Sequence, residues 1–591
     1  MLFIAPFLCA AALAFATPAR AASTGNNFVQ SLVQHTVEPG NGKEPLTLSF
    51  DLPRDGWVHL RIEAESAPVR LQLDRETTPP LQPDAKGSLP EQMRRLAAGK
   101  HTLTLTPQKG GQIREVSIRS VPEMVYFSVD HHSAPVKTVS HAIIREYRDL
   151  KEAGILDNFN IIASEPYSEL PAYLEKVRRW RARGRWWITV SKTPRKPDSS
   201  EEVEHYWASP MGDPDLDGVI IDEFGLKEKH LTQFPFWARS LRELAQRPAL
   251  KGKQFYAFTG FGKPELYRPL AEALMDGDYR IAPEIYLRRM HLLEKTPERM
   301  RQWREAVPGI ERRMVLFLGP DNIAPSMTFH LEPEMNYKAF LDEQFHLFAT
   351  DPAFKGLAGL GIWAARYMDD DILRWYARLV RHYLIEGHTT RLGSDPLYLT
   401  HLQNPGFEQE GKGWELQPGA GGNIGLFDVA SLPFTKSPYS AVPEGKRMLL
   451  TRRGPKEPNR ITQTIRDLQP GRVYHVNVYA LDVRDPARKE LLPLSVNVRG
   501  AERLNATDRT HEARSAKNPP KKGPEDDAFI FTVDTPRHRL TWHHFHRLFK
   551  ATSTTALLEL SDEGAQEGAE IAWDFIELAP DVSLQPLDAP L

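Results

Sequence analysis

Two adjacent acids, Asp222 and Glu223, follow a short run of branched apolar residues, Val219-Ile-Ile221. Such a run between polar residues is typical of a buried strand. Neighbouring side chains of a strand point to opposite sides, so one of the two carboxylates should face any cavity that this strand borders. The alternative is a helix-capping Asp followed by a solvated Glu, which many strand-to-helix loops carry.

A third acid, Glu284, lies in the apolar segment Ile281-Ala-Pro-Glu-Ile285. Burying an ionised carboxylate is costly unless it is paired, so we expect Glu284 to have either an arginine partner or a catalytic role. Two carboxylates across a neutral cleft suit glycoside hydrolysis, in which one protonates the leaving oxygen and the other acts at the anomeric carbon. The expected roles are general acid/base for Glu223 and nucleophile or base for Glu284, with Asp222 positioning or replacing one of them.

Further polar and aromatic residues follow, or lie close to the ends of, predicted strands, where they would contact a substrate. They are Asp130, His131, Glu165, Tyr286, Trp363 and Arg366. Trp363 would offer an aromatic platform and Arg366 a cation, with core packing as the alternative for Trp363. His131 and His132 are adjacent and point apart, and no spaced histidine completes a ligand set, so no metal site is predicted.

Residues 122–392 must position these groups, and they alternate short apolar strands with amphipathic helical segments such as Trp237–Ala245 and Pro297–Ala306. Eight strands in about 270 residues match a (β/α)8 TIM barrel, in which ligands bind at the carboxyl ends of the strands. An open doubly wound sheet is the alternative, although no Gly-rich phosphate loop follows the first strand. The predicted strands are Val125–Val129, Phe159–Ala163, Trp186–Val190, Gly218–Ile221, Phe255–Phe258, Tyr279–Ile285, Met314–Leu318 and Leu360–Ala364.

The segments 23–121 and 400–580 on either side alternate polar and apolar residues with period two, as in Leu46–Leu52 and Val473–Ala480. This pattern predicts half-buried antiparallel strands. The expected architecture is therefore multidomain, a central barrel flanked by N-terminal and C-terminal β-sandwich, jelly-roll-like domains. A helical period appears in the first of these segments only near Pro90–Leu96.

The composition of the 591 residues limits the class of partner. Lys and Arg number 75 against 77 Asp and Glu, which gives a net charge of −2. A chain without a surplus of positive charge is a poor polyanion binder, so a nucleic-acid partner is not expected and a neutral substrate fits better.

The first 22 residues have the pattern of a cleavable signal peptide, an apolar run to Ala16 followed by small residues at Ala19, Ala21 and Ala22. We therefore expect export to a bacterial periplasm or beyond. The single cysteine, Cys9, lies in this segment, so the mature chain should have no disulfide and no thiol nucleophile. No later stretch is apolar enough to predict a membrane span.

The C-terminal segment resembles the CenC-like carbohydrate-binding modules of secreted glycanases. The resemblance lies in Asn404-Pro-Gly-Phe-Glu408, Gly413-Trp414, Leu468-Gln-Pro-Gly-Arg-Val-Tyr474 and the closing Trp573-Asp-Phe-Ile-Glu-Leu578. It implies a glycan partner. Since the closing Asp of that family belongs to a structural calcium region, it also implies Asp574 as a calcium ligand, and no other cofactor is expected.

The barrel segment resembles glycoside hydrolases in two ways. Asp217-Gly-Val-Ile-Ile-Asp222 is similar to the fourth strand of α-glucosidase- and α-galactosidase-like barrels, which implies Asp222 as nucleophile. Glu223 instead occupies the place of the acid/base of the retaining β-glycosidase clan, but Asp222 replaces the Asn expected before it, and Gly319-Pro-Asp321 lacks the strand-seven Glu. The family within the glycoside hydrolases stays open.

The predicted function is that of an exported enzyme that hydrolyses the glycosidic bonds of a poly- or oligosaccharide. Two alternatives remain. One is a non-catalytic glycan-binding protein with an inactive barrel. The other is a polysaccharide lyase, for which Arg366 and His131 would supply the charge-neutralising group and the base.

Overall fold

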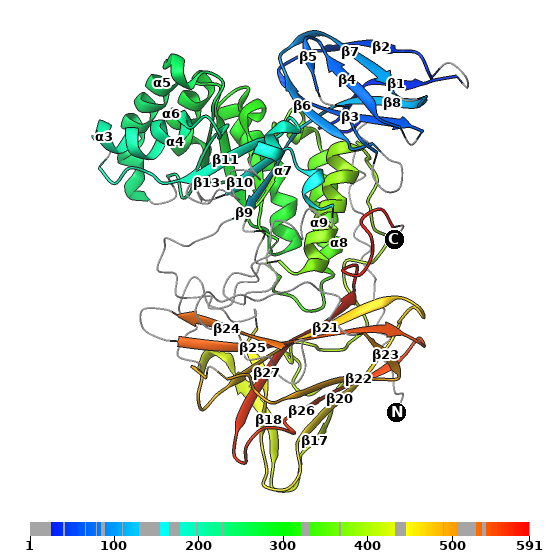
Figure 1. The fold of residues 1–591 in the computed structure, drawn as a ribbon. Coiled ribbons are helices and arrows are strands. Elements are labelled where there is room, and N and C mark those ends of the chain that lie inside the picture. Colours follow the sequence, from blue (N-terminus) through cyan, green and yellow to red (C-terminus); the bar gives the residue numbers. More distant parts are fainter. Residues whose placement is uncertain are drawn as a thin grey trace, which may run out of the picture.

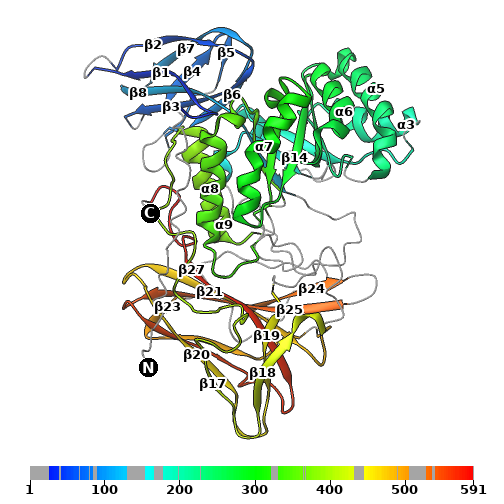
Figure 2. The same ribbon diagram turned by 180° about the vertical axis from the view of Figure 1, so that it is seen from behind.

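A central barrel lies between two β-sandwiches in the computed structural model, with the N-terminal sandwich at one end and the C-terminal sandwich at the other (Figures 1 and 2). Among the residues that the structure describes, no helix has the length and apolar character to cross a membrane. The described residues are 25–38, 42–65, 67–78, 80–83, 89–108, 110–128, 154–164, 178–196, 199–225, 228–320, 330–363, 365, 368–431, 445–488, 490–504, 528–534 and 539–589.

The barrel is closed, because its first strand pairs in parallel with both the second and the last. This confirms the predicted fold class and excludes the open doubly wound sheet. In order around the barrel the strands are β9 (Glu123–Ser128), β10 (Ile161–Ser164), β11 (Trp186–Ser191), β12 (Gly218–Ile221), β13 (Gln254–Gly260), β14 (Arg280–Ile285), β15 (Val315–Leu318) and β16 (Gly359–Ile362).

Helices follow the strands on the outside of the barrel, and most are amphipathic, with one face on the common core. α7 begins seven residues before Pro297, the predicted start of this helix, and Pro297 lies buried inside it. Burial of Leu293, Met300 and Trp303 on one face holds the helix together across the proline. The helices are α3 (Ser200–Val203), η2 (Glu204–Ala208), α4 (Ser209–Gly212), α5 (Phe234–Ala245), α6 (Pro264–Asp276), α7 (Met290–Ala306), α8 (Tyr337–Thr350), α9 (Asp370–Leu379) and η8 (Val380–Ile385).

The N-terminal sandwich packs two antiparallel four-stranded sheets around its own apolar cluster. The helical period near Pro90–Leu96 is misleading, because Gln92–Leu96 forms an edge strand that pairs with β3. One sheet contains β1 (Gln30–Thr36), β8 (Ile113–Val121), β3 (Gly56–Ala64) and β6 (Gln92–Leu96), and the other β2 (Leu46–Leu52), β7 (Gly99–Pro107), β4 (Val69–Leu73) and β5 (Glu76–Thr77).

The C-terminal sandwich packs a four-stranded antiparallel sheet on a larger one around a third apolar cluster. The smaller sheet contains β17 (Glu415–Gln417), β20 (Arg460–Ile465), β26 (Ala556–Ser561) and β22 (Ser495–Arg499). The larger contains β18 (Asn423–Asp428), β19 (Arg447–Arg452), β27 (Glu570–Pro580), β21 (Val473–Asp482), β25 (Arg539–Ala551) and β23 (Ala501–Leu504), with β24 (Ala528–Asp534) also paired to β25.

A buried polar network joins the larger C-terminal sheet to the barrel. The Lys338 ammonium of α8 pairs with Asp371 of α9, and Asp371 accepts a hydrogen bond of 2.6 Å from the backbone of Val582. His475 of β21 lies 3.0 Å from Asp581, and its pKa is raised to about 10 by its carboxylate neighbours despite burial. Both helices begin after the carboxyl ends of barrel strands, so this network places the sandwich on the mouth side of the barrel.

Candidate active site

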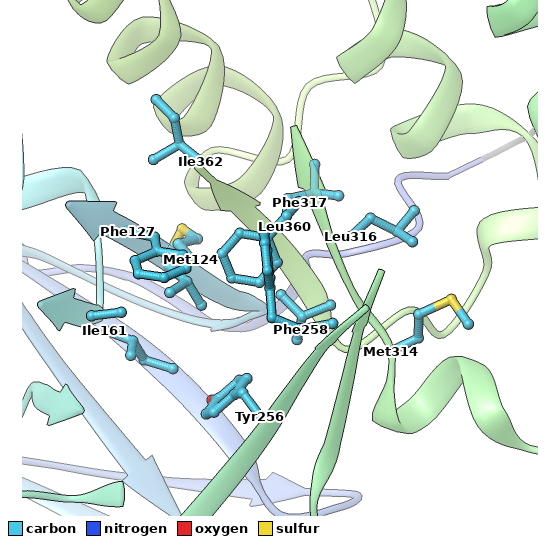
Figure 3. Packing of buried hydrophobic residues seen from close by; sticks show 14 of the residues in the cluster. Met124, Phe127, Ile161, Tyr256, Phe258, Met314, Leu316, Phe317, Leu360 and Ile362 are labelled. Carbon is cyan, nitrogen blue, oxygen red and sulfur yellow. The ribbon is translucent and has the colours of Figure 1, made fainter. Parts of the chain in front are cut away.

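The barrel interior is a layered core with charged groups at both ends. At the amino-terminal end the carboxylate of Glu123 accepts hydrogen bonds from Tyr256 (2.8 Å) and from Arg280 (2.8 Å). Above this pair Phe127, Phe258 and Phe317 meet edge to face, with ring centroids 5.0 to 6.1 Å apart (Figure 3). Gly361 allows this packing, since a Cβ there would lie 2.4 Å from the Phe317 ring.

Glu284 lies at the other end of the same lumen. Side chains of a strand alternate sides, so Arg280, Ala282 and Glu284 of β14 share one face, and Arg280 marks that face as the inner one. Because Ile220 of β12 is in register with the inward-facing Tyr256, the same alternation turns Asp222 inward. Asp222 also continues the strand ladder, since its backbone N–H donates to Ser191.

The backbone turns sharply directly after Asp222. Glu223 has a left-handed φ of 50°, a conformation that costs about 1 kcal/mol or more for a residue with a Cβ. Its N–H donates to the carboxylate of Asp222 (3.0 Å), and the next N–H, of Phe224, donates to Phe258 (2.7 Å). The strained residue is thus held by hydrogen bonds on both sides, and backbone strain of this kind is common at functional sites. The Glu223 side chain is exposed, whereas that of Asp222 is partly buried.

The three acids interact. Burial raises the pKa of Glu284 to about 8, with further contributions from the charges of Asp222 and Glu223, partly offset by the Tyr286 hydroxyl. Burial and the charge of Glu223 raise the pKa of Asp222 to about 6. The sequence left two explanations for Glu284, an arginine partner or a catalytic role. Among the described residues, no cation pairs with Glu284, so the arginine partner is not found there. At neutral pH, Glu284 holds a proton and Asp222 is mostly ionised.

Two aromatic side chains border the acids. The rings of Tyr286, two residues after Glu284, and of Trp363, directly after β16, have centroids 5.3 Å apart. Both are only partly buried. The indole N–H of Trp363 is screened from solvent and, among the described residues, donates to no acceptor.

The first residue of the Asp217–Asp222 motif lies away from the site, and four of the expected site residues lie outside the described part. Asp217 stands at the opposite end of β12 from Asp222, where it binds Arg181 (3.0 Å) and the backbone of Trp187 (2.8 Å), and there it has a structural role. The other four residues expected to contact substrate, Asp130, His131, Glu165 and Arg366, lie outside the described residues, as does Asp321 of the strand-seven segment.

Tyr267 is a neighbour of the site that the sequence did not indicate. It lies on the buried face of α6, and its hydroxyl donates to the carbonyl of Gly225 (3.3 Å). Burial raises its pKa, and the charge of Glu284 contributes. An apolar-looking helix position carries no sequence signal for this contact, which depends on how α6 packs against the loop after β12.

Asp574 in the C-terminal sandwich is the residue that the resemblance to carbohydrate-binding modules implies as a calcium ligand. Asp574 is buried, and burial together with the charges of Glu408 and Glu334 raises its pKa well above its ordinary value. A β-bulge, with Phe575 at a φ of 49°, breaks the strand directly beside it. Carboxylate oxygens are ligands that calcium prefers, so a calcium ion here would take Asp574 and, of the carboxylates that act on it, Glu408, whose Oε1 already accepts the backbone N–H groups of Lys446 and Arg447. Among the described residues, no group of three close ligand atoms includes Asp574.

Two groups of close ligand atoms occur among the described residues, and neither argues for a metal. Asp371, His475 and Asp581 cluster in the interdomain network, but the Lys338 ammonium already supplies the cation. In the group of His382, Glu386 and His388, the carboxylate of Glu386 is 2.9 Å from the Arg381 guanidinium.

No protein-family model matches the chain, and no curated protein matches it. Among solved structures it is similar to a GH18 chitinase from Pseudoalteromonas aurantia, at 10% identity over 44% of this chain and 99% of the other, with a TM-score of 0.29. It is also similar to a GH30 endoxylanase from Clostridium papyrosolvens C71, at 8% identity over 75% and 97% of the two chains, with a TM-score of 0.25. A third is the CBM22-1–GH10 part of an endo-1,4-beta-D-xylanase from Clostridium thermocellum, at 9% identity over 58% and 90%, with a TM-score of 0.26. Glycoside hydrolases and a carbohydrate-binding module are thus among the similar structures, and at these low TM-scores the functional argument rests on the site itself.

Proposed function

We propose that this protein is a glycoside hydrolase that cleaves an oligo- or polysaccharide at the mouth of the barrel, and that it acts outside the cytoplasm. The observation that carries the proposal is the grouping of Asp222, Glu223 and Glu284 at the mouth end of the lumen, where burial and the neighbouring carboxylates raise the pKa of both Asp222 and Glu284. In the described part of the chain, no Lys, Arg or His lies within ion-pair distance of Asp222 or Glu284. A structural cluster of acids would be paired, as Glu123 is with Arg280.

The protonation states assign the roles. Glu284, with a pKa near 8, is the general acid that protonates the leaving oxygen at neutral pH. Asp222, with a pKa near 6, is the ionised partner that attacks the anomeric carbon or activates water. This reverses the roles expected from the sequence, in which Glu223 was the acid/base. Glu223 raises the pKa of both other groups and so helps to retain the proton on Glu284.

The aromatic pair supports a sugar ligand. Sugars present apolar faces that pack on aromatic rings and hydroxyls that need hydrogen-bond partners. Trp363 and Tyr286, both partly exposed, offer the rings.

The test is hydrolysis of a panel of neutral poly- and oligosaccharides by the wild type and three variants. Glu284→Gln and Asp222→Asn should each lower the rate on the cleaved glycan by about 10²–10⁴-fold, the usual contribution of a general acid or base. Glu272→Gln, which removes an exposed carboxylate of α6, is the matched control and should retain the wild-type rate. Full activity in both site variants would refute the assignment, and binding of a glycan without any cleavage by the wild type would favour a non-catalytic binding protein.

A further inference from the structure

A pocket of about 410 Å³ lies at the amino-terminal end of the barrel, opposite the candidate active site. Its walls come from two domains. Arg54 lies in the turn between β2 and β3 of the N-terminal sandwich. Arg312 belongs to the short helix just before β15, and Lys355 to the turn before β16. Figure 2 shows the N-terminal sandwich seated at this end of the barrel.

The lining is strongly cationic. Four cationic side chains, Arg54, Arg304, Arg312 and Lys355, surround a single carboxylate, Glu311. Among the described residues, that carboxylate is a neighbour of Arg304, at 3.9 Å, and Arg304 also donates to the carbonyls of Ala353 and Lys355. One negative charge therefore faces four positive ones.

The arginines next to the pocket are already neutralised. Arg280 pairs with Glu123 at 2.7 Å, and Arg313 pairs with Asp278. In contrast, no carboxylate within ion-pair distance is found for Arg54, Arg312 or Lys355 in the described part of the chain. Partial desolvation at the pocket wall and the positive charges of Arg312 and Arg280 lower the pKa of Arg54, although its side chain remains exposed to solvent, so the fold brings these like charges together at an energetic cost.

We propose that this pocket binds an oxyanion, bridging the N-terminal sandwich and the barrel. Guanidinium groups present parallel N–H donors that match the oxygens of phosphate, sulfate or carboxylate, and converging arginines from two elements are a common way to bind such groups. Phosphate, sulfate and the carboxylate of an acidic sugar share this chemistry. The site is independent of the hydrolysis proposed for the mouth, since none of its residues lies there.

The experiment measures binding to the full-length protein by titration calorimetry at about 20 mM NaCl, where screening is weak. The probes are inorganic phosphate, inorganic sulfate and trigalacturonate, with neutral galactotriose as the control ligand. Binding of at least one anion, weakening steeply with salt, is expected. Arg54→Gln/Arg312→Gln should weaken it at least about tenfold, because two charge-assisted hydrogen-bond donors are lost. Both side chains are exposed, so the thermal midpoint without ligand should stay unchanged.

The matched control is Arg239→Gln, which removes one exposed positive charge from α5, on another part of the surface. It should bind anions as the wild type does. The relative affinities of the inorganic anions and trigalacturonate identify the source of the oxyanion. The proposal is overturned if no anion binds, if Arg239→Gln weakens binding as much as the double variant, or if the double variant binds unchanged.

Discussion

The carboxyl groups at the two ends of the barrel lumen have opposite electrostatic surroundings. At the amino-terminal end, Glu123 is 4% exposed and is held by the guanidinium of Arg280 and the hydroxyl of Tyr256. At the mouth, Glu284 follows Arg280 by four residues on the same strand, is partly buried, and has the acids Asp222 and Glu223 as its charged neighbours in the described part of the chain. The buried ion pair between Glu123 and Arg280 gives the first end a structural role. Unpaired burial keeps a proton on the second, which is the property that acid catalysis needs.

The substitution Glu123→Gln is the strongest test of this difference between the two ends. It leaves the Arg280 guanidinium buried without its counter-charge, which should lower the free energy of unfolding by about 3–5 kcal/mol. Urea unfolding, followed by the fluorescence of the buried tryptophans, measures the change. Glu284→Gln is the matched control on the other end, and it should leave stability unchanged or higher. Equal losses in the two variants would mean that the ends do not differ.

The second prediction extends the contrast to Asp574, another buried carboxyl without a cation among its described neighbours. If it holds calcium with Glu408, a calcium concentration 100 times the dissociation constant should stabilise the C-terminal sandwich by about 2.7 kcal/mol. Scanning calorimetry with calcium and with a chelator measures this effect as a shift in the midpoint temperature of one unfolding transition. An Asp574→Asn variant should lose the response, and a wild type indifferent to chelation would show that the acids hold no calcium.

The third prediction is the pH dependence of kcat/KM. Asp222 must be ionised, so the rate should fall as the pH drops through its pKa of about 6. Glu284 must be protonated, so the rate should also fall as the pH rises through about 8. Each limb approaches about a tenfold loss per pH unit. In Glu284→Gln the residual activity should lack the alkaline limb, and a wild-type profile without that limb would contradict the acid assignment.

The smallest effect is expected at the aromatic pair. Trp363→Ala removes the ring that packs on Tyr286, and should raise KM for the cleaved glycan about two- to twelvefold, corresponding to about 0.5–1.5 kcal/mol. Trp363→Phe keeps a ring but loses the indole N–H, so an intermediate KM separates packing from hydrogen bonding. An unchanged KM in Trp363→Ala would make this residue part of the core instead.

Local patterns were sufficient for much of the fold. Each of the eight apolar runs predicted as barrel strands is a barrel strand, with ends that differ by a few residues, because strands buried on both faces must be continuously apolar. The pattern failed at Gln92–Leu96, where pairing with β3 overrides a helical period, and at Pro297, where buried neighbours extend a helix through a proline. Tertiary packing decides such segments, since β-strand propensities differ by only about 1 kcal/mol per residue and even a proline inside a helix costs only about 3 kcal/mol.

At the candidate site, the sequence by itself determined which acids end barrel strands, because a strand end is a local feature of the apolar run before it. It did not determine their charge. Whether Glu284 meets an arginine or two carboxylates depends on which strands are neighbours and which residues share a register, and Asp222 is 62 positions away along the chain. The same holds for Glu123 and Arg280, 157 residues apart. Electrostatic energies depend on distance in space and on burial, so only the tertiary structure decided where the proton resides.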